Sequence, residues 1–184
     1  MKKFIFSAVV MLLPVLARAQ AEDRNSFSIM AGAWSLDQTY FYREVKTTWG
    51  PVLALEYQRE LNDYFALRMK AFIGKLSRPG DMEADIHGGL SAGVLITPFG
   101  ARLRNLKIGL SPAWVSEGIW YSDPNSMATN KVTYDYFALE IPVRFNIVDN
   151  SHYYISLGLD NLFYTNHGGG IFTSHALIGY GLKF

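Results

Sequence analysis

The residues able to perform covalent chemistry are few, and several of them gather near one end of the sequence. Thr165 and Ser174 carry hydroxyl groups close to His167 and His175, and Asp160 precedes them. A hydroxyl becomes a nucleophile when an imidazole within hydrogen-bonding reach takes its proton. The spacing of these residues does not establish such reach, and histidines in polar segments are usually solvated. We therefore predict no catalytic residue.

Metal and cofactor sites are not predicted either. His87 and His175 have the same inner parity in two predicted strands, but no closely spaced set of ligands surrounds them, and the chain has no cysteine. Basic and acidic residues are almost balanced, at 17 and 16, without the basic cluster that a nucleic-acid-binding protein needs. We expect no metal, no cofactor and no nucleic-acid partner.

A set of charged residues alternates with apolar ones inside otherwise apolar stretches. The set comprises Glu56, Glu60, Arg68, Lys70, Lys107, Glu140, Arg144, Asp160 and Lys183. The candidate network consists of Glu56, Arg68, Lys70, Lys107, Glu140 and Arg144. Charges that are removed from water must be paired. We predict a charge network on one buried face, in which Glu56 or Glu140 pairs with Arg68, Arg144 or Lys107.

Alternation with a period of two residues runs through most of the chain and predicts the elements that carry these charges. It indicates eight strands, at residues 26–36, 50–61, 64–76, 86–99, 106–115, 132–148, 153–163 and 175–184. Short turns at residues 62–63, 100–105 and 149–152 alternate with longer polar segments at 37–48, 77–85, 116–131 and 161–170. This layout is typical of an all-β, eight-stranded antiparallel up-and-down transmembrane β-barrel.

The polar face distinguishes a membrane barrel from a soluble lipocalin-like barrel, which would turn its apolar face inward. Gly, Ser and Ala accompany the charges on that face, as a narrow lumen requires. Aromatic residues at the strand ends predict two girdles at the membrane interfaces. Those toward the longer segments are Trp34, Trp49, Trp114, Trp120, Tyr134 and Phe163, and those toward the short turns are Tyr64, Phe65, Phe99, Phe145, Tyr153 and Phe184.

Both termini indicate export to the outer membrane. Residues 1–21 have two lysines, a short apolar run and A-x-A patterns, which predict a cleaved signal peptide and leave 22–184 as the barrel domain. Cleavage after Ala19 or Ala21 is equally compatible. At the other end, Gly179, Leu182 and Phe184 resemble the signal read by the outer-membrane assembly machinery, while Leu177 departs from its usual polar residue.

Two stretches resemble the porin-like outer-membrane β-barrel domain family of Gram-negative bacteria. Tyr136 and residues 139–142 are similar to its "YLEIPL" stretch, and residues 53–74 are similar to its strand-turn-strand. The resemblance implies the fold and little about activity. Glu140 and Pro142 lie on the inner parity, where the proline is expected to interrupt a ladder bond, as at a bulge.

The predicted function is a structural or surface-interaction role with a plugged lumen. Candidate contacts are the aromatic residues of the longer segments, Tyr40, Tyr42, Trp49, Trp120 and Tyr121. Expected partners are outer-membrane lipid and lipopolysaccharide, the assembly machinery, and an extracellular partner bound through the loops.

Two alternatives stay open. One is a lipid A-modifying enzyme, although Phe163 and Thr165 stand where the deacylase pattern has its His and Ser. The other is a small-solute channel. The sequence leaves enzymatic activity undecided and favours a protein without it.

Overall fold

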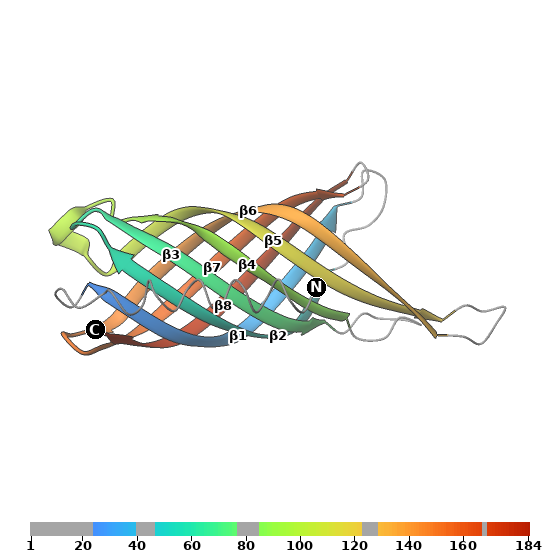
Figure 1. Ribbon diagram of the computed structural model, residues 1–184, viewed down its shortest axis with the longest axis horizontal. Helices are drawn as coiled ribbons and strands as arrows, with labels where there is room; N and C mark the ends of the chain where they lie inside the picture. Colours follow the sequence, from blue (N-terminus) through green and yellow to red (C-terminus); the bar gives the residue numbers. More distant parts are fainter. Residues whose placement is uncertain (1–23, 40–46, 77–84, 123–128, 167–168) are drawn as a thin grey trace.

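The computed structural model describes residues 24–39, 47–76, 85–122, 129–166 and 169–184. They form the strands β1 (Asn25–Thr39), β2 (Thr47–Glu60), β3 (Phe65–Leu76), β4 (Asp85–Ile96), β5 (Leu106–Ser122), β6 (Thr129–Asp149), β7 (Tyr153–Asn166) and β8 (Gly169–Lys183), with a 3-10 helix η1 (Gly100–Leu103). Consecutive strands pair antiparallel, and β8 pairs with β1, which closes the barrel (Figure 1). The prediction of an all-β, eight-stranded antiparallel barrel is confirmed.

The period-two pattern separates an apolar exterior from a polar interior. In β2, Leu53 and Leu55 are 57% and 46% exposed, whereas Glu56 beside them is buried. Ile178 and Leu182 repeat the outward parity in β8. An apolar exterior around a charged interior is the arrangement of a membrane barrel, because a water-soluble barrel would bury the apolar side chains instead.

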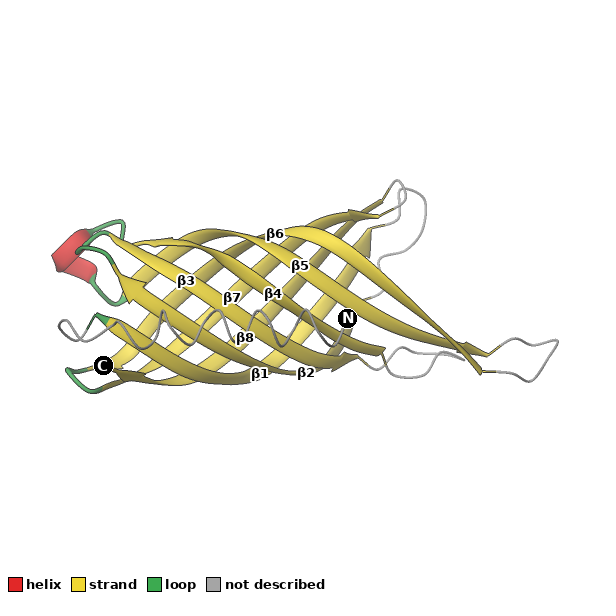
Figure 2. Ribbon diagram, viewed as in Figure 1, coloured by secondary structure: helices red, strands yellow, loops and turns green. Residues whose placement is uncertain are grey.

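One end of the barrel carries the short turns, η1 and the C-terminus (Figure 2). Exposed aromatic residues surround this end, among them Tyr64, Phe99 and Tyr153. They form the predicted girdle near the short turns. In barrels of this kind the short turns face the periplasm, and we name the two ends accordingly. No helix in the described part of the chain is long and apolar enough to cross a membrane.

The strands extend further than the apolar pattern predicts. Segment 116–131 was expected to be a loop, but the β5–β6 ladder continues to the pair Ser122–Thr129. The β7–β8 ladder likewise reaches Asn166–Gly169 within the predicted segment 161–170. Backbone pairing continues beyond the apolar belt because hydrogen bonds between strands do not depend on membrane contact. The predicted longer segments were therefore too long.

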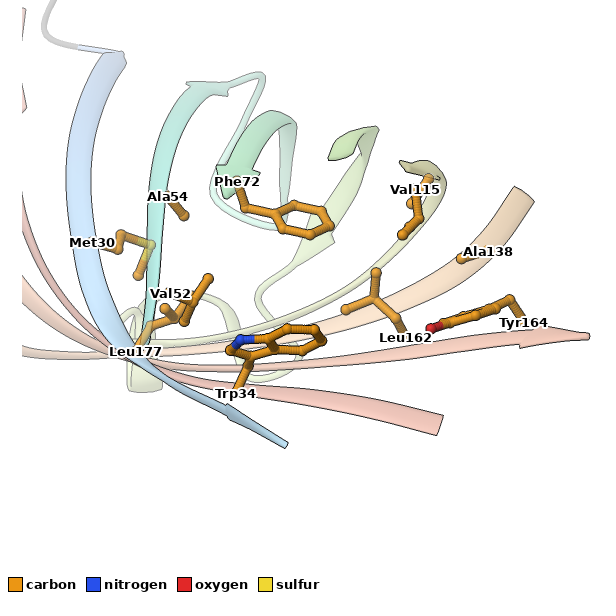
Figure 3. Packing of buried hydrophobic residues seen from close by; sticks show 11 residues of the cluster. Met30, Trp34, Val52, Ala54, Phe72, Val115, Ala138, Leu162, Tyr164 and Leu177 are labelled. Atoms are coloured by element: carbon orange, nitrogen blue, oxygen red, sulfur yellow. The ribbon is translucent and has the colours of Figure 1, made fainter. Parts of the chain in front are cut away.

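Trp34 corrects the predicted outer girdle. It is fully buried in the interior, packed in one cluster with Val52, Phe72 and Leu162 (Figure 3). Its parity explains this position, because it lies six residues after Ser28 on the inward face of β1. Its closeness to the end of the predicted strand had suggested an interfacial role, but parity decides which face a side chain occupies.

Pro142 interrupts a ladder, as predicted, but no bulge lies at this position. Pro142 pairs in register with Asp160, and the register of the β6–β7 ladder shifts between Asn146 and Val148 instead. On its other side, Pro142 is not paired in the β5–β6 ladder, although the register is the same before and after it. Proline therefore interrupts a ladder without adding a residue to the strand, since it lacks a backbone N–H.

The closing β1–β8 ladder passes very close to Gly32. A Cβ atom added to Gly32 would lie 1.8 Å from the carbonyl oxygen of Ala176. We expect Gly32→Ala to destabilise the closed barrel by about 1–3 kcal/mol, because the two backbones must separate. The measurement is the fraction of unboiled protein that migrates as the compact form on an SDS gel.

Gly88→Ala is the matched control for this prediction. A Cβ atom at Gly88 would lie 3.2 Å from its nearest neighbour, the carbonyl oxygen of Phe72. Small adjustments can accommodate this contact, so the compact fraction should fall less than in Gly32→Ala. Equal behaviour of the two variants would contradict the tight closure at β1–β8.

Candidate functional site

Six charged side chains meet in the middle of the barrel interior. We call Glu56, Arg68, Lys70, Glu140, Arg144 and Asp160 the lumen network. They come from β2, β3, β6 and β7. All six are at most 2% exposed, and the set contains three cations and three carboxylates. The charges of the network are therefore balanced without solvent.

Arg68 reaches all three carboxylates of the network. Its Nε donates to Glu56 at 2.7 Å, one terminal nitrogen donates to Glu140 at 2.8 Å, and the other lies 3.3 Å from Asp160. Such a planar fork of donors suits several acceptors at once. Arg68 thereby connects the β2 and β3 side of the barrel with the β6 and β7 side.

Arg144 and Lys70 complete the pairing. Arg144 donates to Glu56 at 2.6 Å and to both oxygens of Asp160. Lys70 donates to Asp160 at 2.7 Å and also to Glu140. Every carboxylate is thus held by at least two cations, which compensates part of the cost of removing these charges from water.

Register and small residues place these groups together. Glu56 is the cross-strand partner of Lys70, and Arg144 is the partner of Gly158. A Cβ atom at Gly158 would lie 2.9 Å from a terminal nitrogen of Arg144. The absence of a side chain at position 158 therefore leaves the space that the guanidinium occupies.

The structure brings five of the six predicted network residues together. The sixth, Lys107, lies apart near the periplasmic mouth, where its Nζ donates to Glu60 at 2.9 Å and to Gln58 at 3.2 Å. Asp160 takes part in the lumen network although it was absent from the candidate network. The sequence pattern places Asp160 on the inward face with Ser156, but parity alone does not show which inward charges meet.

A second layer of side chains lies next to the lumen network. We call Trp34, Phe72, His87 and His175 the ring layer, and each of them is at most 5% exposed. Lys70 connects the two layers, because its Nζ lies 4.7 Å from the centre of the Phe72 ring. Buried apolar residues such as Val115 and Leu162 continue the packing in the same cluster as Trp34 and Phe72 (Figure 3).

A polar cavity of about 370 Å³ occupies the periplasmic mouth. Glu60, Lys107, Asp149 and Lys183 contribute to its lining, and none of the lumen-network residues does. Lys183 pairs there with Asp149, as Lys107 does with Glu60. The cavity therefore belongs to the mouth rather than to the packed interior.

Solved structures provide the comparison for this geometry, since no family model and no curated protein matches the sequence. Ail, the attachment invasion locus protein of Yersinia pestis, superposes with a TM-score of 0.63 and 11% identity, over 88% of this chain and 99% of Ail. A second Ail structure, in complex with the heparin analogue sucrose octasulfate, gives 0.61 and 12%, over the same shares of both chains. OprG from Pseudomonas aeruginosa gives 0.51 and 12%, over 90% of this chain and 98% of OprG.

The chain is an eight-stranded barrel of the outer-membrane type. Neisserial surface protein A shares this fold, with a TM-score of 0.53 and 11% identity over 86% of this chain and 97% of that protein. The fold and the apolar exterior together place the protein in the outer membrane. For the resemblance to the porin-like domain family, these comparisons support the shared fold and nothing narrower.

The outer-membrane barrel closes through the residues of the predicted assembly signal. Phe184 donates its backbone N–H to the carbonyl oxygen of Asn25 at 2.9 Å, and Asn25 donates back at 3.1 Å. Phe184 and Leu182 point outward, and Gly179 lies against Met30 inside. Recognition of these residues by the assembly machinery stays a prediction.

The predicted surface contacts are only partly described. Trp49 is 62% exposed near the start of β2. The backbone of Trp120 and Tyr121 lies in β5, whereas their side chains, and all of Tyr40 and Tyr42, lie outside the described part.

The residues considered for catalysis lie on both faces of the barrel, and His167 lies outside the described part, whereas His87 and His175 are both buried in the lumen. Phe163 is exposed on the outer face, whereas Asp160 and His175 are buried in the lumen. Over the described ranges, no three His, Asp or Glu side chains are grouped closely enough to bind a metal ion.

Proposed function

We propose that this outer-membrane barrel is closed to solutes and acts through contacts made at the cell surface. The main support for the proposal is the packed interior of the barrel, in which the lumen network lies directly against the ring layer. No side chain in either layer is more than 5% exposed. An eight-stranded barrel has an interior just wide enough to be filled in this way.

Two similar structures support a role at the surface. Ail is named as an attachment invasion locus protein and was solved with a heparin analogue, and another relative in fold is named a surface protein. The aromatic residue Trp49 is strongly exposed close to a longer connection. Exposed aromatic side chains are frequent anchors of protein interfaces.

The closed lumen predicts an electrically silent protein. Purified barrel inserted into a planar lipid bilayer should show no stepwise conductance above that of the protein-free membrane, because the buried ion pairs leave no continuous water path. The protein is delivered by fusing lipid vesicles with the bilayer, and the compact form of the unboiled protein on an SDS gel verifies that the barrel in those vesicles is folded. Regular conductance steps from folded wild-type protein would contradict the proposal and support the small-solute channel.

The surface role is tested separately, with immobilised heparin as the probe. Cells that display the barrel should bind heparin, and a variant with Tyr40→Ser, Tyr42→Ser and Trp49→Ser should lose most of this binding. Tyr64→Ser is the matched control, because Tyr64 is an exposed aromatic at the opposite end of the barrel. Equal binding by all three strains, or by cells without the barrel, would contradict a contact made through these aromatic residues.

A further inference from the structure

The ring layer holds two histidines in an arrangement that the lumen network does not explain. The His87 and His175 ring centres are 6.0 Å apart, with ring planes at 84°. Trp34 stacks on His87 at 4.2 Å, and Phe72 lies 4.8 Å from His175. Each imidazole therefore contacts an aromatic ring as well as the other imidazole.

The nitrogen atoms of this layer have no hydrogen-bond partner in the described structure. They are Nδ1 and Nε2 of His87, Nδ1 and Nε2 of His175, and Nε1 of Trp34, all fully buried. A buried polar atom without a partner typically costs about 1–3 kcal/mol. Five such atoms in one layer are buried without compensation from protein groups, so a ligand of these nitrogens would stabilise the layer.

The separation of the two imidazoles fits one shared metal ion. A nitrogen lies about 1.1 Å from its ring centre and about 2.0–2.1 Å from a bound ion, so the centres can be at most about 6.3 Å apart. The observed 6.0 Å lies just inside this limit. A shared ion at this separation requires that one nitrogen of each ring faces it and that the angle between the two bonds is wide, as in two-coordinate metal ions.

The charged side chains around His87 and His175 indicate which charge a bound metal ion can have. The lumen network is neutral, and the nearby Lys70 already donates to Glu140 and Asp160. Asp160 is the cross-strand partner of His175, but it is engaged by Arg144 and Lys70. Because the described residues bring no third ligand to the pair, a divalent ion would lack both ligands and neutralising charge.

We propose that the ring layer binds one monovalent d10 metal ion, copper(I) or its analogue silver(I), between His87 and His175. Imidazole is a good ligand for copper. The inference is independent of the proposed surface role.

Silver(I) is the probe, because it is stable in air and needs no reductant. The barrel is refolded in detergent with silver nitrate in a chloride-free buffer and desalted, and bound silver is then measured by elemental analysis. Wild-type protein should retain about one ion per chain, with quenched emission from the tryptophan next to the site. X-ray absorption should report two nitrogen neighbours with the multiple scattering of imidazole.

Single variants decide which residues hold the ion. His87→Phe and His175→Phe should each weaken silver binding at least tenfold, and the aromatic layer can accept phenylalanine in either place. His152→Phe is the matched control, because His152 is exposed in the periplasmic turn and should leave binding unchanged. The compact form of the unboiled protein on an SDS gel, which is lost on boiling, confirms that each variant is folded.

Three results would overturn the proposal. One is wild-type protein that retains no silver after desalting. Another is equal retention by wild type and by the folded double variant His87→Phe/His175→Phe, which would assign the silver to surface methionines such as Met69. The third is an absorption spectrum without imidazole scattering, which would leave water as the occupant of the ring layer.

Discussion

Asp160→Asn should lower the free energy of unfolding by about 3–5 kcal/mol, because it leaves buried cations uncompensated. Asp160 accepts hydrogen bonds from Arg68, Lys70 and Arg144. Without its charge, three cations share the two remaining carboxylates in an interior that excludes water. The measurement is urea unfolding of the barrel in lipid vesicles, followed by tryptophan fluorescence.

Two further variants distinguish the loss of charge balance in the interior from a general effect of replacing an aspartate. Asp63→Asn removes the partner of Arg104 in an exposed pair 3.6 Å apart, and such pairs contribute at most about 1 kcal/mol. The double variant Asp160→Asn/Lys70→Met restores equal numbers of charges and should recover part of the loss. A similar stability for Asp160→Asn and Asp63→Asn would refute the structural role of the lumen network.

Leu157→Arg should destabilise the barrel by about 2–4 kcal/mol in a bilayer, since arginine on the lipid face is most costly near the membrane midplane. Leu157 is exposed on the outer face of β7, four residues from the periplasmic start of the strand. The expected loss is measured by the same unfolding experiment in lipid vesicles.

Tyr153→Arg is the control for depth in the membrane. Tyr153 has the same outward parity and begins β7 at the periplasmic end, where arginine costs only about 0–1 kcal/mol. Equal losses at positions 153 and 157 would contradict the proposed position of the bilayer around the barrel.

The sequence predicts the strands well because their pattern is local. A strand with one lipid-facing and one inward face alternates over a few residues, and this alternation is independent of the neighbouring strands. It identified Leu53 and Leu55 as outward and Glu56 as inward, as the structure shows. Strand ends were less predictable, because the ladders continue beyond the apolar belt.

The contacts within the lumen depend on information that is not local. Parity places Glu56 and Asp160 inside, but the relative height of β2 and β7 depends on the stagger of every ladder around the barrel. For this reason Lys107 was grouped with residues that it does not contact, and Asp160 was omitted from the candidate network. The approach of His87 to His175 could not be predicted for the same reason, since β4 and β8 are not neighbours.

The distribution of the lumen-network charges has a consequence for assembly of the barrel. The hairpin of β2 and β3 contributes Glu56, Arg68 and Lys70, which together carry one excess positive charge. The hairpin of β6 and β7 contributes Glu140, Arg144 and Asp160, which carry one excess negative charge. Before the barrel closes, the inner faces of these two hairpins therefore attract each other across the interior. A hairpin assembled in the wrong place would leave an unmatched charge in the membrane, so the network favours the correct order of strands.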